Sequence, residues 1–88
     1  MRGVMLASSR RLTLVGKPDC HLCHEMRAVV AAVVGASAID DLDLRDDPVL
    51  ERRYVFEIPV LLWGKMEVAR HRVSAAELRT RLAELGWR

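Results

Sequence analysis

The sequence KPDCHLC at residues 17–23 contains the only two cysteines of the chain, Cys20 and Cys23. It follows an apolar run, Leu12–Val15, and it begins a helical pattern. A thiol at the start of a helix faces unpaired backbone N–H groups and the positive end of the helix dipole, and both favour the thiolate. Because the thiolate is the form that attacks disulfides, this position makes the pair a candidate dithiol redox centre.

The length of 88 residues predicts a single domain over residues 1–88, with residues 1–10 as a loosely attached N-terminal segment. A hydrophobic fraction of 51% is typical of a globular protein. The formal net charge is only +2, and no basic run is longer than a pair of arginines. With one Tyr, one Phe and two Trp, the chain has too few aromatic residues for a stacking platform, so no nucleic-acid partner is expected.

The apolar stretches are all shorter than the ~20 residues of a membrane span, so no membrane partner is expected. Met1 to Ala7 contains an early Arg and only a few apolar residues, fewer than the roughly 7–15 of a signal-peptide core, and we therefore expect a cytoplasmic location. In a reducing compartment, a pair of cysteines is more often catalytic or metal-binding than a structural cross-link.

The apolar spacing and the turn residues predict the element order β-α-β-α-β-β-α. A strand at 11–16, a helix at 20–34 and a polar strand at 38–44 form a parallel βαβ unit. A short helix at 48–54 follows, with Asp and Pro at its start. Strands at 58–63 and 67–72 form a hairpin, and a capping box opens the last helix at residue 74. These elements predict an α/β fold, a mixed four-stranded sheet with helices on both faces.

This order resembles the thioredoxin fold, because a Cys-x-x-Cys motif lies at the first strand-to-helix junction and Ile58-Pro59 precedes the third strand. In detail the chain is similar to the small glutaredoxin-like proteins with a Cys-His-Leu-Cys motif, over roughly residues 11 to 86. The resemblance implies a thioredoxin-like (glutaredoxin-like) fold. It also implies a thiol–disulfide oxidoreductase that reduces or exchanges disulfides through a mixed-disulfide intermediate.

The resemblance assigns roles to individual residues. It implies that Cys20 is the exposed attacking thiol and that Cys23 is the buried resolving thiol. Pro59 would be a cis-proline facing the dithiol, and the backbone of Ile58 would pair with a bound peptide or with glutathione. Lys17 would lie near the thiolate or near the glycine carboxylate of glutathione.

Two features differ from the glutaredoxin pattern. The residues between the cysteines are His21 and Leu22, where glutaredoxins usually carry an aromatic residue, and we expect both to contact substrate. The Gly-Gly and Asp that hold the γ-glutamyl group of glutathione are replaced by VARHRVS at 68–74, in which Ser74 can offer a helix N-terminus to a carboxylate. The expected partners are a disulfide-containing protein or glutathione as co-substrate, with no bound cofactor.

Other interpretations of the same residues stay open. The sequence CHLCH at 20–24 also matches the string for c-type haem attachment, which would require export and an axial ligand. Zinc, or an iron–sulfur cluster shared across a dimer with glutathione, would use the two cysteines and nearby histidines. A closed zinc site needs four convergent ligands, however, so no metal site is expected. The alternative function is a non-enzymatic thioredoxin-fold module that binds a partner protein or a metal.

Overall fold

The computed structural model describes residues 10–87, so the expected N-terminal segment lies almost entirely outside this range. Within it, the order β-α-β-α-β-β-α is confirmed, with short 3₁₀ turns at 36–38 and 44–46. The helices and strands are β1 (Leu12–Gly16), α2 (His21–Val34), β2 (Ile39–Asp43), α3 (Pro48–Tyr54), β3 (Val60–Trp63), β4 (Met66–Arg70) and α4 (Ala75–Leu85).

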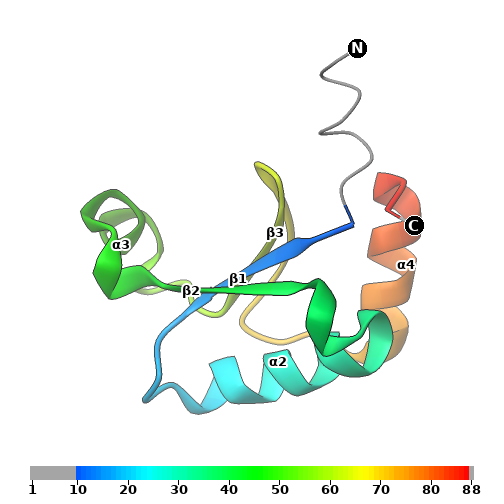
Figure 1. The fold of residues 1–88 in the computed structure, drawn as a ribbon, viewed down its shortest axis with the longest axis horizontal. Helices are drawn as coiled ribbons and strands as arrows, with labels where there is room; N and C mark the ends of the chain where they lie inside the picture. Colours follow the sequence, from blue (N-terminus) through cyan, green and yellow to red (C-terminus); the bar gives the residue numbers. More distant parts are fainter. Residues whose placement is uncertain (1–9, 88) are drawn as a thin grey trace.

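The four strands form one mixed sheet in the order β2-β1-β3-β4 (Figure 1). β1 pairs parallel with β2 and antiparallel with β3, and β3 pairs antiparallel with β4. The parallel pair is joined through α2, as the predicted βαβ unit requires. α2 and α4 pack against each other on one face, whereas α3 lies on the other side of the sheet, so helices on both faces are confirmed.

Local sequence signals set the helix ends. α3 begins after Asp47, whose side chain accepts hydrogen bonds from the backbone of the first turn, and Pro48 occupies a first-turn position. α4 begins with the predicted capping box, in which Ser74 and Glu77 exchange side-chain-to-backbone hydrogen bonds. α4 ends at Gly86, which has the left-handed φ of 87° that a C-terminal cap needs.

Two cores of unequal size lie on the two faces of the sheet. The core under α2 and α4 is the larger; its buried residues are Leu12, Leu14, Met26, Val30, Ile39, Leu61, Val68, Ala69, Val73, Leu78 and Leu82. The core on the α3 side consists of Val15, Leu44, Tyr54 and Val60. Most of the apolar burial that stabilises the fold is therefore on the α2 face.

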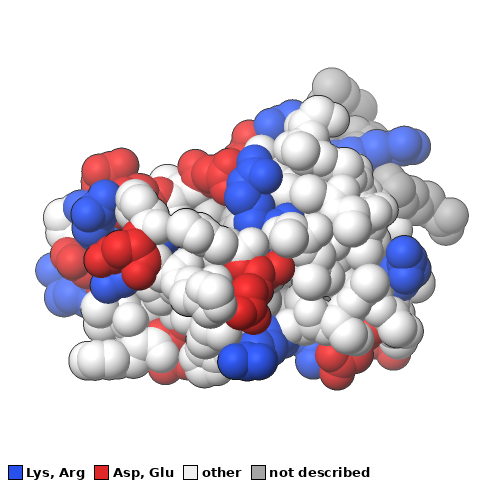
Figure 2. Space-filling model, turned by 90° about the horizontal axis from the view of Figure 1, so that it is seen from below, with Lys and Arg blue, Asp and Glu red and all other residues white. Residues whose placement is uncertain are grey.

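The edge strand β2 is polar because three of its five residues are aspartates. Each aspartate is paired with an arginine: Asp40 with Arg11, Asp41 with Arg27 and Asp43 with Arg45. The paired guanidinium groups hold the pKa of Asp40 and of Asp43 below the usual range through side-chain hydrogen bonds. The face of the molecule in Figure 2 likewise shows acidic and basic side chains interspersed rather than gathered by sign.

Two strand ends differ from the prediction by two residues, and the other strand ends agree with it to within one residue. β3 begins at Val60 rather than at residue 58, because Pro59 has no N–H to donate to the ladder. β4 ends at Arg70 rather than at residue 72, because His71 adopts a left-handed φ of 64° and turns the chain out of the sheet. Among residues 10–87, no helix is both long and apolar enough to cross a membrane.

Candidate active site

The cysteine pair lies at the N-terminus of α2. Cys20 is the residue that caps the helix, in an extended conformation, and Cys23 lies in the first turn. The two form a disulfide, with their Cα atoms 5.2 Å apart. The Cys20 Sγ also accepts a hydrogen bond of 3.1 Å from the backbone N–H of Cys23. One of the N–H groups that a helix start leaves unpaired is therefore directed at the Cys20 sulfur, a position from which it would stabilise a thiolate once the disulfide is reduced.

The two cysteines differ in exposure. Cys20 is partly exposed, whereas Cys23 is buried, with 5% of its surface accessible. An incoming disulfide can therefore reach the sulfur of Cys20, while Cys23 lies one helical turn inside. This asymmetry matches what an attacking thiol and a resolving thiol each require.

Gly16, the last residue of β1, makes a close contact that the sequence pattern did not reveal. A Cβ atom added at Gly16 would lie 2.8 Å from the Cys23 Sγ and 3.1 Å from its Cβ. Any side chain at this position would displace the cysteine. In the sequence, this glycine merely ends a strand pattern, and only its position four residues before Cys20 hints at a close approach.

The Ile58–Pro59 peptide bond is cis. β3 begins at Val60 opposite Val15, next to the end of β1, so Pro59 is at the end of the sheet where β1 leads into the cysteines. Pro59 is buried and Ile58 is partly buried. The N–H of Ile58 donates to the Tyr54 carbonyl at 3.1 Å. The Ile58 N–H is therefore already paired within the protein.

The residues between the cysteines point in different directions. The His21 side chain is highly exposed, and its Nε2 lies 2.7 Å from a carboxylate oxygen of Glu25, one turn further along α2. Leu22 is partly buried. Glu25 was not among the predicted site residues, although the i, i+4 spacing from His21 is a signal for such a pair. Among residues 10–87, no three His, Cys, Asp or Glu side chains are arranged to hold a metal ion.

Lys17 lies in the loop between β1 and α2. It lines a pocket of about 190 Å³ together with Gly16, Cys23 and the Arg27–Asp41 ion pair. Its ammonium group also contributes, as a minor cause, to the lowered pKa of Asp43. Lys17 is thus beside the buried cysteine and β2, whereas Ile58 and Pro59 belong to a different loop.

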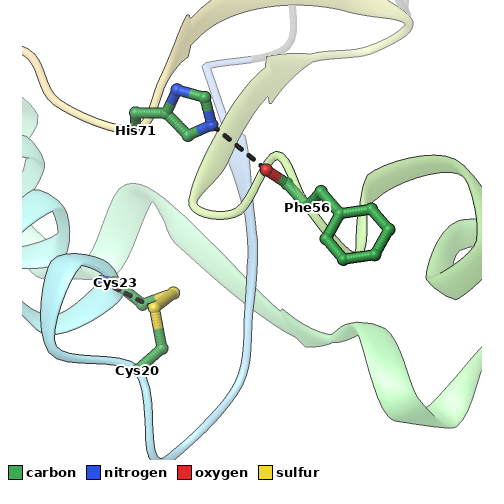
Figure 3. Close-up of a disulfide and its surroundings, with 4 residues drawn as sticks. All are labelled: Cys20, Cys23, Phe56 and His71. Atoms are coloured by element: carbon green, nitrogen blue, oxygen red, sulfur yellow. Dashed lines mark hydrogen bonds between the residues drawn. A yellow bond between two sulfur atoms is a disulfide. The ribbon is translucent and has the colours of Figure 1, made fainter.

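A second pocket, of about 280 Å³, lies between α2 and the segment that joins β4 to α4. Glu25, Arg72 and Ser74 contribute to its wall, together with His71. In Figure 3, the His71 ring extends from this segment toward the Phe56 carbonyl, and the disulfide lies below them. His71 was not among the predicted site residues, and the strand-like pattern of its neighbours gave no signal of the turn.

This arrangement defines a class of protein: a thioredoxin-like sheet that carries a Cys-x-x-Cys pair at a helix start and a cis-proline before β3. Within that class the family is also clear. The model of the glutaredoxin-like domain (DUF836) matches residues 11–83, and the chain belongs to this family. Comparison with curated proteins gives no match, and comparison with solved structures gives none.

Proposed function

We propose that this protein is a thiol–disulfide oxidoreductase with Cys20 as nucleophile and Cys23 as resolving thiol. The observation that carries the proposal is the asymmetry of the pair. Cys20 caps α2, is partly exposed and receives a backbone hydrogen bond at its sulfur, while Cys23 is buried within disulfide distance. Membership of the glutaredoxin-like family supports a thiol redox role.

The reaction would take place in two exchanges. The Cys20 thiolate attacks one sulfur of a substrate disulfide, a new S–S bond forms, and the other substrate sulfur leaves as a thiolate. Cys23 then loses its proton to solvent and attacks the Cys20 sulfur. The second substrate sulfur leaves as a thiolate and the Cys20–Cys23 disulfide forms. The substrate gains two electrons, and the protein loses two.

We further propose that glutathione restores the dithiol. One glutathione thiolate attacks the Cys20 sulfur of the protein disulfide, and Cys23 leaves as a thiolate. A second glutathione thiolate then attacks the glutathione sulfur of the mixed disulfide, so that Cys20 leaves as a thiolate and glutathione disulfide forms. Glu25, which pairs with His21, lies on the wall of the pocket between α2 and the β4–α4 segment. Arg72 and the start of α4 also contribute to this wall. A cytoplasmic location, where glutathione is abundant and reduced, belongs to the same proposal.

The remaining predicted residues have supporting roles in this proposal. Pro59 and the Ile58 carbonyl would align the backbone of the substrate beside the dithiol, and the exposed His21 and the partly buried Leu22 would contact the groups flanking its sulfur. Lys17 would act through its positive charge on the Cys23 side, because it lines the pocket next to that residue.

The decisive experiment traps the intermediate. In Cys23→Ser the resolving thiol is gone, so incubation with glutathione disulfide should leave a stable adduct of one glutathione per chain at Cys20, detected by intact mass and peptide mapping. Cys20→Ser is the matched control and should give no adduct, because Cys23 is buried. Equal labelling of the two variants would reject the proposed roles. The roles would also be rejected if neither variant formed an adduct with glutathione disulfide or with cell proteins.

A second candidate function, a non-enzymatic binding module, is favoured by the exposed apolar side chains of Phe56 and Val49, which are 87% and 61% accessible. This alternative predicts that partner binding survives in a Cys20→Ser, Cys23→Ser double variant. Pull-down with the double variant and with Phe56→Ser separates the two candidates. Partners retained by the first variant and lost by the second would support the binding module.

A further inference from the structure

His71 has a backbone conformation that is uncommon for its residue type. Its φ of 64° is in the left-handed region, where non-glycine residues are rare and histidine is one of the more tolerated exceptions. Such conformations persist when surrounding contacts determine them. Here the backbone N–H of His71 donates to the Pro59 carbonyl at 2.8 Å, which ties the end of β4 to the cis-proline.

The side chain of His71 makes a second contact with the loop that contains Pro59. Its Nε2 lies 3.4 Å from the Phe56 carbonyl, and because a carbonyl only accepts, this nitrogen must carry the hydrogen. The same Nε2 is 3.7 Å from a carboxylate oxygen of Glu57. The neighbouring Arg70 also binds Glu57, at 2.5 Å. Residues 70 and 71 therefore hold the loop that precedes β3 from its β4 side.

The other side of this loop is anchored to α3. The N–H groups of Glu57 and Ile58 both donate to the Tyr54 carbonyl, at 2.7 and 3.1 Å. Apolar packing adds little at the loop tip, because the Phe56 ring is 87% exposed and points away from the disulfide (Figure 3). Ile58 packs against the α3-side core and Pro59 is buried, so polar contacts determine the position of the loop mainly at Phe56. Among residues 10–87, the His71 ring makes the one hydrogen bond to the Phe56 carbonyl.

We propose that His71 is a positioning residue whose ring fixes residues 56–59, and with them the Ile58 carbonyl and Pro59, relative to the dithiol. The proposal rests on the proposed function, because that function gives these backbone groups the task of aligning substrate. Neither the family motif nor the Cys-x-x-Cys pair assigns this task to a residue after β4. The role belongs to the side chain, and the left-handed backbone sets the direction in which the ring extends.

Two variants separate the ring from the backbone. Glycine adopts a φ of 64° without a Cβ penalty, so His71→Gly keeps the tie to Pro59 and removes the ring. His71→Gln keeps a side-chain N–H donor of similar reach but, like histidine, must carry its Cβ at positive φ. If His71 acts through its backbone, His71→Gly should behave like the wild type. If His71 acts through its side chain, His71→Gln should be the variant that behaves like the wild type.

Amide hydrogen exchange measures the loop directly. If the ring holds the loop, the N–H groups of Glu57 and Ile58 should exchange roughly 5–10-fold faster in His71→Gly, the effect of losing one net hydrogen bond. In His71→Gln they should exchange within about 2-fold of the wild-type rates, because the donor is restored. Unchanged exchange in His71→Gly, or faster exchange only in His71→Gln, would overturn the proposal.

Turnover of glutathione disulfide gives the second readout. His71→Gly should raise KM roughly 5-fold and leave kcat within about 2-fold, because positioning affects substrate alignment and not the thiols. His71→Gln should restore KM. An equal KM in His71→Gly and the wild type would contradict the positioning role. If the wild-type protein itself shows no Cys20-dependent turnover, the proposed function fails, and the exchange experiment then decides the role of His71 alone.

Discussion

The two faces of the sheet hold the two halves of the candidate site in different ways. The cysteines begin α2, which packs with α4 over the larger core. The cis-proline loop follows α3, on the face with the smaller core of four buried residues. Ile58 packs against this core and Pro59 is buried, while hydrogen bonds and ion pairs to β4 hold the part of the loop before them. The comparison separates a half whose cysteines lie over the larger core from a half that polar contacts attach to β4, and under the proposed function this second half would contact the substrate.

The largest difference between the two faces should appear in matched core truncations. Leu78 and Leu44 are both almost fully buried, one on each face. Leu78→Ala should cost about 3–4 kcal/mol, because the larger core cannot collapse around the cavity, and Leu44→Ala about 2 kcal/mol. Urea unfolding of both variants measures the free energies of unfolding. Equal costs would show that the smaller core is packed as rigidly as the larger one.

The half with the cysteines can be tested next at Gly16. Its added Cβ would lie 2.8 Å from the Cys23 Sγ, so Gly16→Ala should cost about 1–3 kcal/mol through overpacking. In a Cys23→Ala background the sulfur is absent, and the same change should cost clearly less. A double-mutant cycle by chemical denaturation gives the difference, and an identical cost in both backgrounds would mean that the contact is not the cause.

These tests also show which features a sequence can predict. The ends of α3 and α4 follow from Asp47, Pro48 and the Ser74–Glu77 capping box, because caps depend on residues only a few positions apart. The contact of Gly16 with Cys23 and the turn at His71 depend on how a strand end meets a helix or a loop. Local pattern carries no such information, and the strand was therefore predicted to continue to residue 72.

The start of α4, on the face with the larger core, should show a smaller effect. The Ser74 hydroxyl accepts a hydrogen bond from the Glu77 N–H, and Ser74→Ala removes this cap. The expected loss is about 1 kcal/mol. Ser74→Gly is the matched control. Glycine is itself tolerated at the N-cap position, so this change should cost only a few tenths of a kcal/mol. Thermal unfolding of the two variants measures the difference, and equal losses would argue against the cap.

The smallest effect concerns pH. The Ser74 N–H donates to the Glu77 carboxylate and lowers its pKa in the folded protein. A depressed folded pKa contributes stability above the unfolded value of about 4.3, and this contribution is lost as pH falls through the folded value. The wild type should therefore exceed Glu77→Gln in stability at pH 6, with the gap closing toward pH 2. Unfolding curves across this range test it, and a constant gap would exclude the linkage.

The three arginine–aspartate pairs along β2 have a consequence for how molecules meet one another. β2 is at one edge of the sheet, and an uncovered edge is a template on which a second chain can add a strand. A neighbour that docked there would have to approach charged groups that already pair with each other and remain hydrated. The polarity that makes β2 an unusual strand thus discourages aggregation, and acid or high salt, which weaken the pairs, should increase self-association.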